Sequence, residues 1–191
     1  MHCQLFGNKK SDVEIQANFD LNKYLGVWNE LYRTANIPFE DSTNTDVTAT
    51  YSLNADGTIQ VKNREWLPNE NVWSTIIGEG TQPYPSDRPA ALTVRFSQFQ
   101  PPGDYRILFT DYENIAVIYS YSAYLLGLVR LEYAWILARQ PIISENLTNL
   151  AFGIFEERVG LKKEDFRQTP VGVAPGVVID ISDNLFDNIR W

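Results

Sequence analysis

Eight short strand-like runs follow one another between residues 24 and 139, and this repetition is the feature that most constrains the fold. They cover residues 24–34, 45–53, 58–66, 72–82, 90–97, 104–111, 114–122 and 131–139. Turn-forming residues separate them: Asn54-Ala55-Asp56-Gly57 suits a hairpin, and Pro101-Pro102-Gly103 breaks the chain. The pattern predicts an all-β antiparallel sheet, and closing such a sheet on itself would remove its exposed edges.

A single helical pattern follows the last of these runs. Its apolar residues share the spacing of one helix face: Leu147, Leu150, Ala151, Ile154 and Phe155. Ser144 is a suitable N-cap residue, and Gly160 is a natural stop. We therefore expect one C-terminal α-helix, whose apolar face covers the outer side of the sheet.

One domain accounts for most of the chain, and we delimit it as residues 19–169. Residues 1–18 are mostly polar and are expected to form a loose N-terminal arm. The C-terminal tail, residues 170–191, contains several apolar residues. We expect this tail to add an edge strand or to cover a face of the sheet.

Charge and hydropathy exclude several classes of protein. The net charge is −8, whereas a nucleic-acid-binding protein would carry a basic stripe, so no nucleic acid is expected as a partner. No run approaches the length of about 18 apolar residues that a transmembrane helix needs. The first residues show no apolar signal-peptide region. The localisation stays open between a cytoplasmic protein and the mature form of a secreted or periplasmic one.

Few residues could support metal binding or nucleophilic chemistry. His2 is the only histidine and Cys3 the only cysteine, so we expect no multi-histidine metal site and no internal disulfide. We also expect no cofactor and no enzymatic activity. Lipidation of Cys3, as in a mature lipoprotein, is left open by the sequence.

Three short segments carry a more specific signal. They are Lys23-Tyr24-Leu25-Gly26-Val27-Trp28-Asn29-Glu30, Thr110-Asp111-Tyr112 and Trp135-Ile136-Leu137-Ala138-Arg139. In this order and spacing they resemble the three conserved blocks of the lipocalins. Residues 47–53 and 90–92 are similar to the branch that holds the bacterial lipocalins and apolipoprotein D. The resemblance implies an eight-stranded antiparallel up-and-down β-barrel, with one C-terminal α-helix packed outside.

The resemblance also implies binding, storage or transport of a small hydrophobic ligand, such as a fatty acid, lysophospholipid, sterol or carotenoid-like molecule. Inward-facing positions taken from the family pattern supply the candidate ligand-binding residues. These are Glu30, Tyr32, Ala49, Tyr51, Val61, Asn63, Val94, Phe96, Tyr105, Ile107, Phe109, Ile118, Tyr133 and Trp135. Small residues among aromatic ones would leave space inside. The alternatives are a filled barrel that serves as a protein-interaction module, and an enzyme built on the same barrel.

Six further residues are expected, by the same resemblance, to have structural roles: Gly26, Trp28, Thr110, Asp111, Tyr112 and Arg139. Trp28 should plug the closed end of the barrel. Arg139 should lie across its indole, a cation–π contact that contributes roughly 0.5–2 kcal/mol. Asp111 is suited to cap backbone donors in a tight turn.

Glu30 admits two interpretations. As a buried acid it could anchor the head group of a ligand, or act as an acid–base group in a lipocalin-like enzyme. It could instead be a glutamate that neighbouring tyrosine or arginine side chains satisfy. We favour the second interpretation.

The segment that ends the seventh predicted strand is unusually apolar for a loop at the mouth of a barrel. It contains Tyr124, Leu125, Leu126 and Leu128. An exposed apolar patch usually marks a contact, here with a membrane surface, a partner or a second copy in a homodimer. Alternatively, the strands are longer, or the leucines fold back over the interior.

Overall fold

The computed structural model describes residues 13–35, 43–99, 102–124 and 129–179, with only the backbone described at 123, 124, 129 and 130. Its elements are the helices α1 (Leu21–Tyr24) and α2 (Glu145–Val159), the 3₁₀ turn η3 (Lys163–Asp165), and the strands β1 (Gly26–Thr34), β2 (Thr45–Leu53), β3 (Ile59–Leu67), β4 (Val72–Thr81), β5 (Ala91–Arg95), β6 (Gly103–Thr110), β7 (Ile115–Tyr124), β8 (Val129–Ala138) and β9 (Phe166–Gln168).

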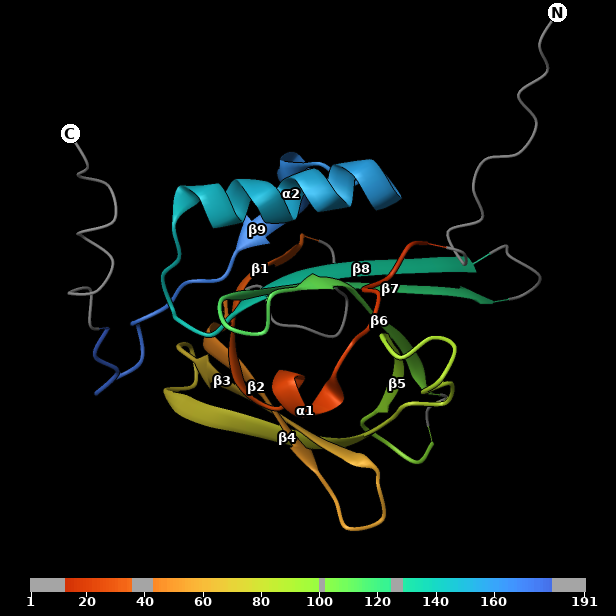
Figure 1. Cartoon of the computed structure of the whole chain (residues 1–191). Coiled ribbons are helices and arrows are strands. Elements are labelled where there is room, and N and C mark those ends of the chain that lie inside the picture. The colour runs from red at the N-terminus through yellow and green to blue at the C-terminus, as the bar shows by residue number, and fades with distance from the viewer. Residues whose placement is uncertain (1–12, 36–42, 100–101, 125–128, 180–191) are drawn as a thin grey trace, which may run out of the picture.

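Eight of these strands form a closed antiparallel barrel. The hydrogen-bonded order runs from β2 through β8 to β1, and β1 pairs again with β2. Figure 1 shows this ring of strands, with α1 at one end and α2 across one side. The fold class predicted from the sequence is confirmed. The short helix α1 was not predicted, and only its last residue, Tyr24, lay within the first predicted strand.

The barrel is tighter at one end than at the other. β1 pairs with β2 from Gly26 to Asn29, at the closed end. Further along, at Tyr32–Thr34, β1 pairs instead with β9, which lies outside the barrel. The pairing of β4 with β5 is also short, from Glu79 to Thr81. The strands therefore separate toward the open end.

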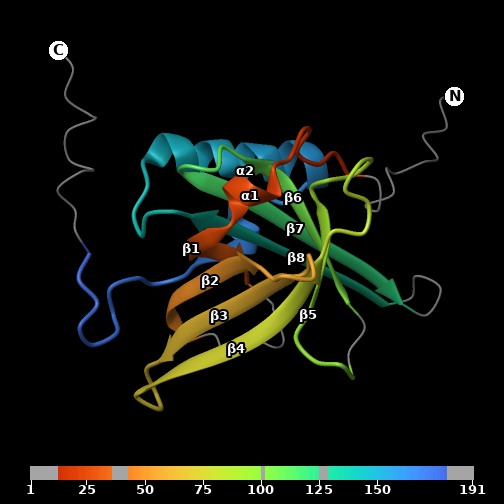
Figure 2. The same cartoon turned by 60° about the horizontal axis from the view of Figure 1, so that its bottom comes forward.

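Two hydrophobic cores lie on the two faces of the sheet. The inner core lies inside the barrel and includes Trp28, Tyr51, Ile107 and Ile118. The outer core lies between α2 and the outward face of β6, β7, β8 and β1, and it buries Phe155 completely. Figure 2 shows α2 lying across these strands. The sheet therefore separates the inner core from the helix.

The helix begins and ends as its sequence predicts. The Ser144 side chain accepts a hydrogen bond from the backbone N–H of Leu147. Gly160 adopts φ +75° at the C-terminus, a conformation that glycine reaches without strain. The predicted apolar face is correct except at Leu150, which is 46% exposed, while Phe152 and Val159 are buried.

The two ends of the domain are held more firmly than expected. Val13 is buried in the outer core, and the backbone N–H of Gln16 donates to the carbonyl of Ile107. The prediction of a loose arm is therefore wrong for residues 13–18, while residues 1–12 lie outside the described residues. The extra edge strand is β9, which precedes the tail; within 170–179 no strand is assigned, and residues 180–191 lie outside the described part.

The position of Phe155 predicts how much α2 contributes to stability. Phe155→Ala should lower the free energy of unfolding by about 3–5 kcal/mol, because it leaves a cavity in the outer core. Leu150→Ala, on the exposed face of the same helix, should change it by less than about 1 kcal/mol. Urea unfolding followed by tryptophan fluorescence measures both. Equal effects of the two substitutions would show that α2 is not packed as described.

Candidate functional site

The closed end of the barrel is built around Trp28. Its indole is completely buried, and its Nε1 donates to the carbonyl of Tyr24 at 2.8 Å. The guanidinium of Arg139 lies 3.7 Å from the centre of the indole ring. Gly26, at φ +100°, lies beside this guanidinium, and a Cβ there would be 3.2 Å from its Nη1. A larger residue at position 26 would therefore be strained and crowded.

Arg139 also joins separate segments of backbone at this end. Its guanidinium donates to the carbonyls of Lys23, Leu25 and Val27 and to that of Tyr112. Partial burial among these groups lowers the pKa of Arg139. The planar guanidinium has five donors in a fixed fork and spans these separate carbonyls, whereas the three donors of a lysine ammonium diverge from a single nitrogen.

The Thr110-Asp111-Tyr112 segment forms the turn between β6 and β7 at the same end. The carboxylate of Asp111 accepts hydrogen bonds from the backbone N–H groups of Asn114 and Ile115. Partial burial acts to raise the pKa of Asp111, but these hydrogen bonds outweigh it and hold the pKa below its ordinary value. The Thr110 hydroxyl donates to the carbonyl of Ile115. The arrangement organises a turn and contains no reactive group.

Three tyrosine hydroxyls meet inside the barrel above Trp28. The Tyr105 hydroxyl lies 2.8 Å from that of Tyr24 and 2.7 Å from that of Tyr51. Burial raises the pKa of Tyr24 and of Tyr105 well above the ordinary value, and raises that of Tyr51 to about 12. Tyr24, Tyr51 and Tyr105 are called the tyrosine cluster below. Tyr51 and Tyr105 were predicted to face inward, whereas Tyr24 was predicted as the start of the first strand and as part of a conserved block.

Cross-strand register identifies the other inward positions, because directly paired residues share a face of the sheet. Trp28 pairs with Ala49, Ala49 with Asn63, and Asn63 with Ile76. Continuing around the barrel, the inward residues are Tyr51, Val61, Leu92, Val94, Tyr105, Ile107, Ile118, Trp135 and Leu137. The structure thus brings most of the predicted ligand-binding residues to one interior.

This interior is buried at its base and partly exposed above it. Ile59, Ile107 and Ile118 are buried, whereas Ala49, Asn63, Val94, Phe96 and Trp135 retain exposed surface. Tyr133 and Trp135 lie together, with ring centres 6.2 Å apart. Phe96 packs over Gly78, where a Cβ would be 2.7 Å from the phenyl ring. Three apolar side chains of the upper wall, Val94, Phe96 and Trp135, therefore keep accessible surface.

Two of the predicted inward residues face the other way. Tyr32 packs edge-on against Phe152 of α2, with ring centres 5.2 Å apart, and Phe109 contacts the outer core. An irregularity between Glu30 and Tyr32 shifts the register of β1 against β8, and a second lies between Ile107 and Phe109 in β6. Each shift reverses the alternation of side chains. The prediction that Tyr32 and Phe109 face the interior is therefore wrong.

The same irregularity places Arg33 inside the barrel, and this second charge beside Glu30 was not predicted. Arg33 is fully buried and forms an ion pair with Glu30 at 3.0 Å. It also donates to Asn44, which in turn donates to Glu65. The hydroxyl of Thr169 donates to Glu30. Glu30, Arg33, Asn44, Glu65 and Thr169 are called the polar network below, and they support the interpretation of Glu30 as a satisfied buried acid.

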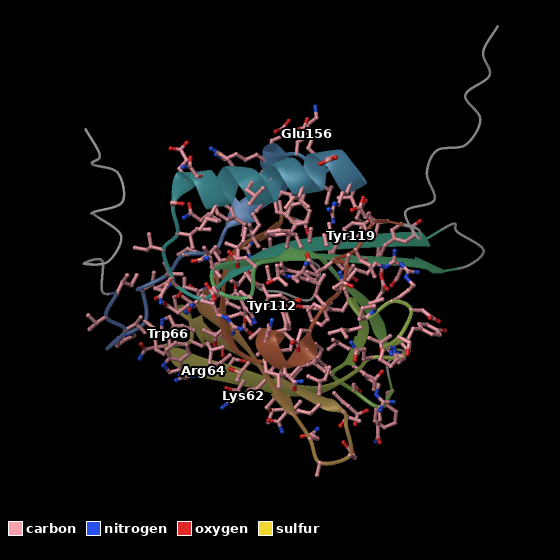
Figure 3. All side chains as sticks on the ribbon, viewed as in Figure 1. Lys62, Arg64, Trp66, Tyr112, Tyr119 and Glu156 are labelled. Atoms are coloured by element: carbon pink, nitrogen blue, oxygen red, sulfur yellow. The ribbon has the colours of Figure 1, made fainter. Side chains whose placement is uncertain are left out.

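Other features lie outside this interior. Figure 3 shows Lys62 and Arg64 on the outer side of β3 and Tyr119 on the helix side of the sheet. Two surface pockets, of about 340 and 280 Å³, lie beside Ile77 of β4 and beside Val178 near the C-terminus. Residues 125–128 of the mouth segment lie outside the described residues, and the side chain of Tyr124 is not described.

Within the described ranges, no three His, Cys, Asp or Glu residues are grouped in a way that could hold a metal ion. None of the helices there has the length and apolar character that a membrane span requires.

The contacts of Arg139 predict that lysine cannot replace it. Arg139→Lys should lower the free energy of unfolding by about 2–3 kcal/mol, because several hydrogen bonds to carbonyls are lost. Arg95→Lys, in an exposed ion pair with Glu79, should change it by less than about 0.5 kcal/mol. Urea unfolding at constant ionic strength compares the two, and a similar loss in both would contradict the role of Arg139 at the closed end.

The polar network predicts that removing one charge of the buried ion pair destabilises the protein more than removing both. Arg33→Met should lower the free energy of unfolding by about 3–5 kcal/mol, because it leaves the carboxylate of Glu30 buried without its cation. The double substitution Glu30→Gln with Arg33→Met should recover at least half of that loss, since no buried charge remains at the pair. Urea unfolding of both variants measures this, and a double variant less stable than Arg33→Met would contradict it.

Comparison with known proteins relates this architecture to named relatives. Residues 19–170 match a family model described as a lipocalin-like domain. Apolipoprotein D of Macaca fascicularis is 38% identical over 156 residues, covering 81% of this chain and 79% of that protein. The outer membrane lipoprotein Blc of Citrobacter freundii is 33% identical over 135 residues, covering 71% of this chain and 70% of that protein. The match to apolipoprotein D of Bos taurus, at 39% identity, spans 65% of that protein's length.

Solved structures share the fold at lower identity. Insecticyanin from the tobacco hornworm Manduca sexta superposes with a TM-score of 0.70 at 19% identity, covering 83% of this chain and 84% of that chain. Lobster apocrustacyanin A1 superposes with a TM-score of 0.64 at 21% identity, covering 78% of each chain. At these identities the likeness shows a common fold.

Proposed function

The chain belongs to the lipocalin family, and on that premise we propose that it binds a small hydrophobic ligand inside its barrel, for storage or transport and without chemical turnover. The observation that carries the proposal is the accessible apolar wall above the buried base. Val94, Phe96 and Trp135 point inward and keep exposed surface. A protein that only needed a core would bury these side chains.

The energetics of such a site favour an apolar ligand. Each buried methylene contributes about 0.8 kcal/mol, so a chain of a dozen carbons gains roughly 10 kcal/mol before the costs of immobilisation. Few directed polar contacts are then needed for micromolar affinity. The mostly apolar wall of this barrel matches that requirement.

The ionisable side chains inside the barrel favour ligand binding over catalysis. Glu30 is engaged by Arg33 and by Thr169, so its carboxylate is held in place by partners. The tyrosine hydroxyls are held in their neutral form by burial. A general base must be free to take a proton from a substrate, whereas the carboxylate of Glu30 is occupied by contacts with its neighbours.

Filling the interior tests the proposal. Val94→Trp should reduce the affinity for the hydrocarbon fluorophore diphenylhexatriene at least ten-fold, because the added indole occupies the space that the ligand would take. Thr75→Trp, which adds the same side chain on the outer face of β4, where Thr75 is exposed, should leave the affinity unchanged. Fluorescence titration measures both, with circular dichroism to show that each variant is folded.

The result that would reject the proposal is equally specific. If the wild-type protein binds no diphenylhexatriene, or if Val94→Trp binds it as well as wild type, the barrel interior is not the ligand site. The filled-barrel interaction module would then be the better interpretation.

A further inference from the structure

The polar atoms inside the barrel select a chemical class of ligand. This inference rests on the proposed function and concerns the same interior. The two contacts of the tyrosine cluster use two of its three hydroxyl protons, with Tyr105 in the middle. Each hydroxyl can both donate and accept, so the cluster can offer a third proton to a ligand. Tyr105 is also the member of the cluster that is partly exposed.

Burial keeps this donor available across the physiological pH range. Burial raises the pKa of Tyr51 to about 12, and it raises those of Tyr24 and Tyr105 well above the ordinary value. Since all three hydroxyls stay protonated, the cluster adds no charge to the interior. A neutral oxygen atom, such as that of an alcohol or a carbonyl, is a suitable acceptor for it.

Asn63 supplies a second polar position in the same interior. Its side-chain Oδ1 is buried and has no hydrogen-bond partner among the described residues. Asn63 pairs with Ala49, and the next inward pair toward the closed end is Val61 with Tyr51. It therefore lies one step above the tyrosine cluster. Because a buried acceptor without a donor costs free energy, a ligand hydroxyl that donates to Asn63 would relieve that cost.

The charged groups of the interior disfavour an anion. Among the described inward residues, the charged ones are Glu30, Arg33 and Glu65, which sum to one negative charge. Arg33 is committed to Glu30 and Asn44. A carboxylate ligand buried here would lose its hydration and face two glutamates, with the nearest cation already engaged.

From this placement we propose that the preferred ligand is a neutral amphiphile, whose hydroxyl or carbonyl oxygen is bound at the inner end by the tyrosine cluster and Asn63, with its apolar body extending along Val94, Phe96 and Trp135. The barrel binds such a molecule in preference to the free acid of the same length.

Ligands that differ only in their head group test this selectivity. 1-Dodecanol, dodecanoate and dodecylamine compete with diphenylhexatriene for the wild-type protein at pH 7.4, in fluorescence displacement titrations below the micelle concentration of each. We expect dodecanol to bind about ten-fold more tightly than dodecanoate, the result of burying a charge without a partner. Dodecanoate or dodecylamine binding as tightly as dodecanol, or more tightly, would overturn the inference.

Two substitutions test whether Tyr105 and Asn63 bind the polar group of the ligand. Tyr105→Phe and Asn63→Leu should each weaken dodecanol binding about five-fold, the effect of one lost neutral hydrogen bond. Both should leave the affinity for diphenylhexatriene unchanged, because it has no polar atom. Tyr84→Phe, at an exposed tyrosine between β4 and β5, removes a hydroxyl outside the barrel and should change neither affinity.

The outcomes separate this inference from the proposed function. If diphenylhexatriene binds and both variants bind dodecanol as the wild type does, the selectivity mechanism is rejected while ligand binding stands. A parallel loss of diphenylhexatriene and dodecanol in the variants would also reject it, because the hydroxyl and the amide would then act on the fold. If diphenylhexatriene and the dodecyl compounds all fail to bind the wild-type protein, both proposals are rejected.

Discussion

The stacking of Arg139 on Trp28 is the interaction on which the rest of the barrel depends. The guanidinium joins the end of the last barrel strand to the chain that enters the first one, across 116 residues of sequence at Lys23. It also binds the turn between β6 and β7 through Tyr112. An antiparallel sheet without this closure would expose two unpaired edges. The apolar interior exists because the edges meet here.

From this end upward, the interior changes from neutral to ionic. The tyrosine cluster lies next to Trp28, apolar side chains follow, and the polar network lies where β1 and β2 cease to pair. Thr169 reaches Glu30 from the segment after β9. The carboxylate of Asp46, at the start of β2, accepts hydrogen bonds from the N–H groups of Val173 and Ala174. The C-terminal segment therefore stabilises the seam of the barrel that strand pairing leaves open.

The parts of this structure that the sequence predicts are those set by local signals. Alternation and turn residues located the eight strands, and Ser144 and Gly160 located the ends of α2 within one residue. The contact of Arg139 with Trp28 was expected from the family resemblance. The buried position of Val13 and the strand β9 were not expected, because both depend on distant partners: the outer core under α2 for one, and the edge of β1 for the other.

The interior itself could be predicted only in part, since a shift of one residue in register exchanges the two faces of a strand. In β1 the shift lets Tyr32 pack against Phe152 of α2, a contact between segments 120 residues apart that no local pattern contains. The shift also changes which side chain of β1 faces the interior of the barrel. Arg33 takes the inward position, pairs with Glu30 and so removes a free carboxylate from the interior. The packing of a helix outside the barrel thus determines the charge that a ligand meets inside it.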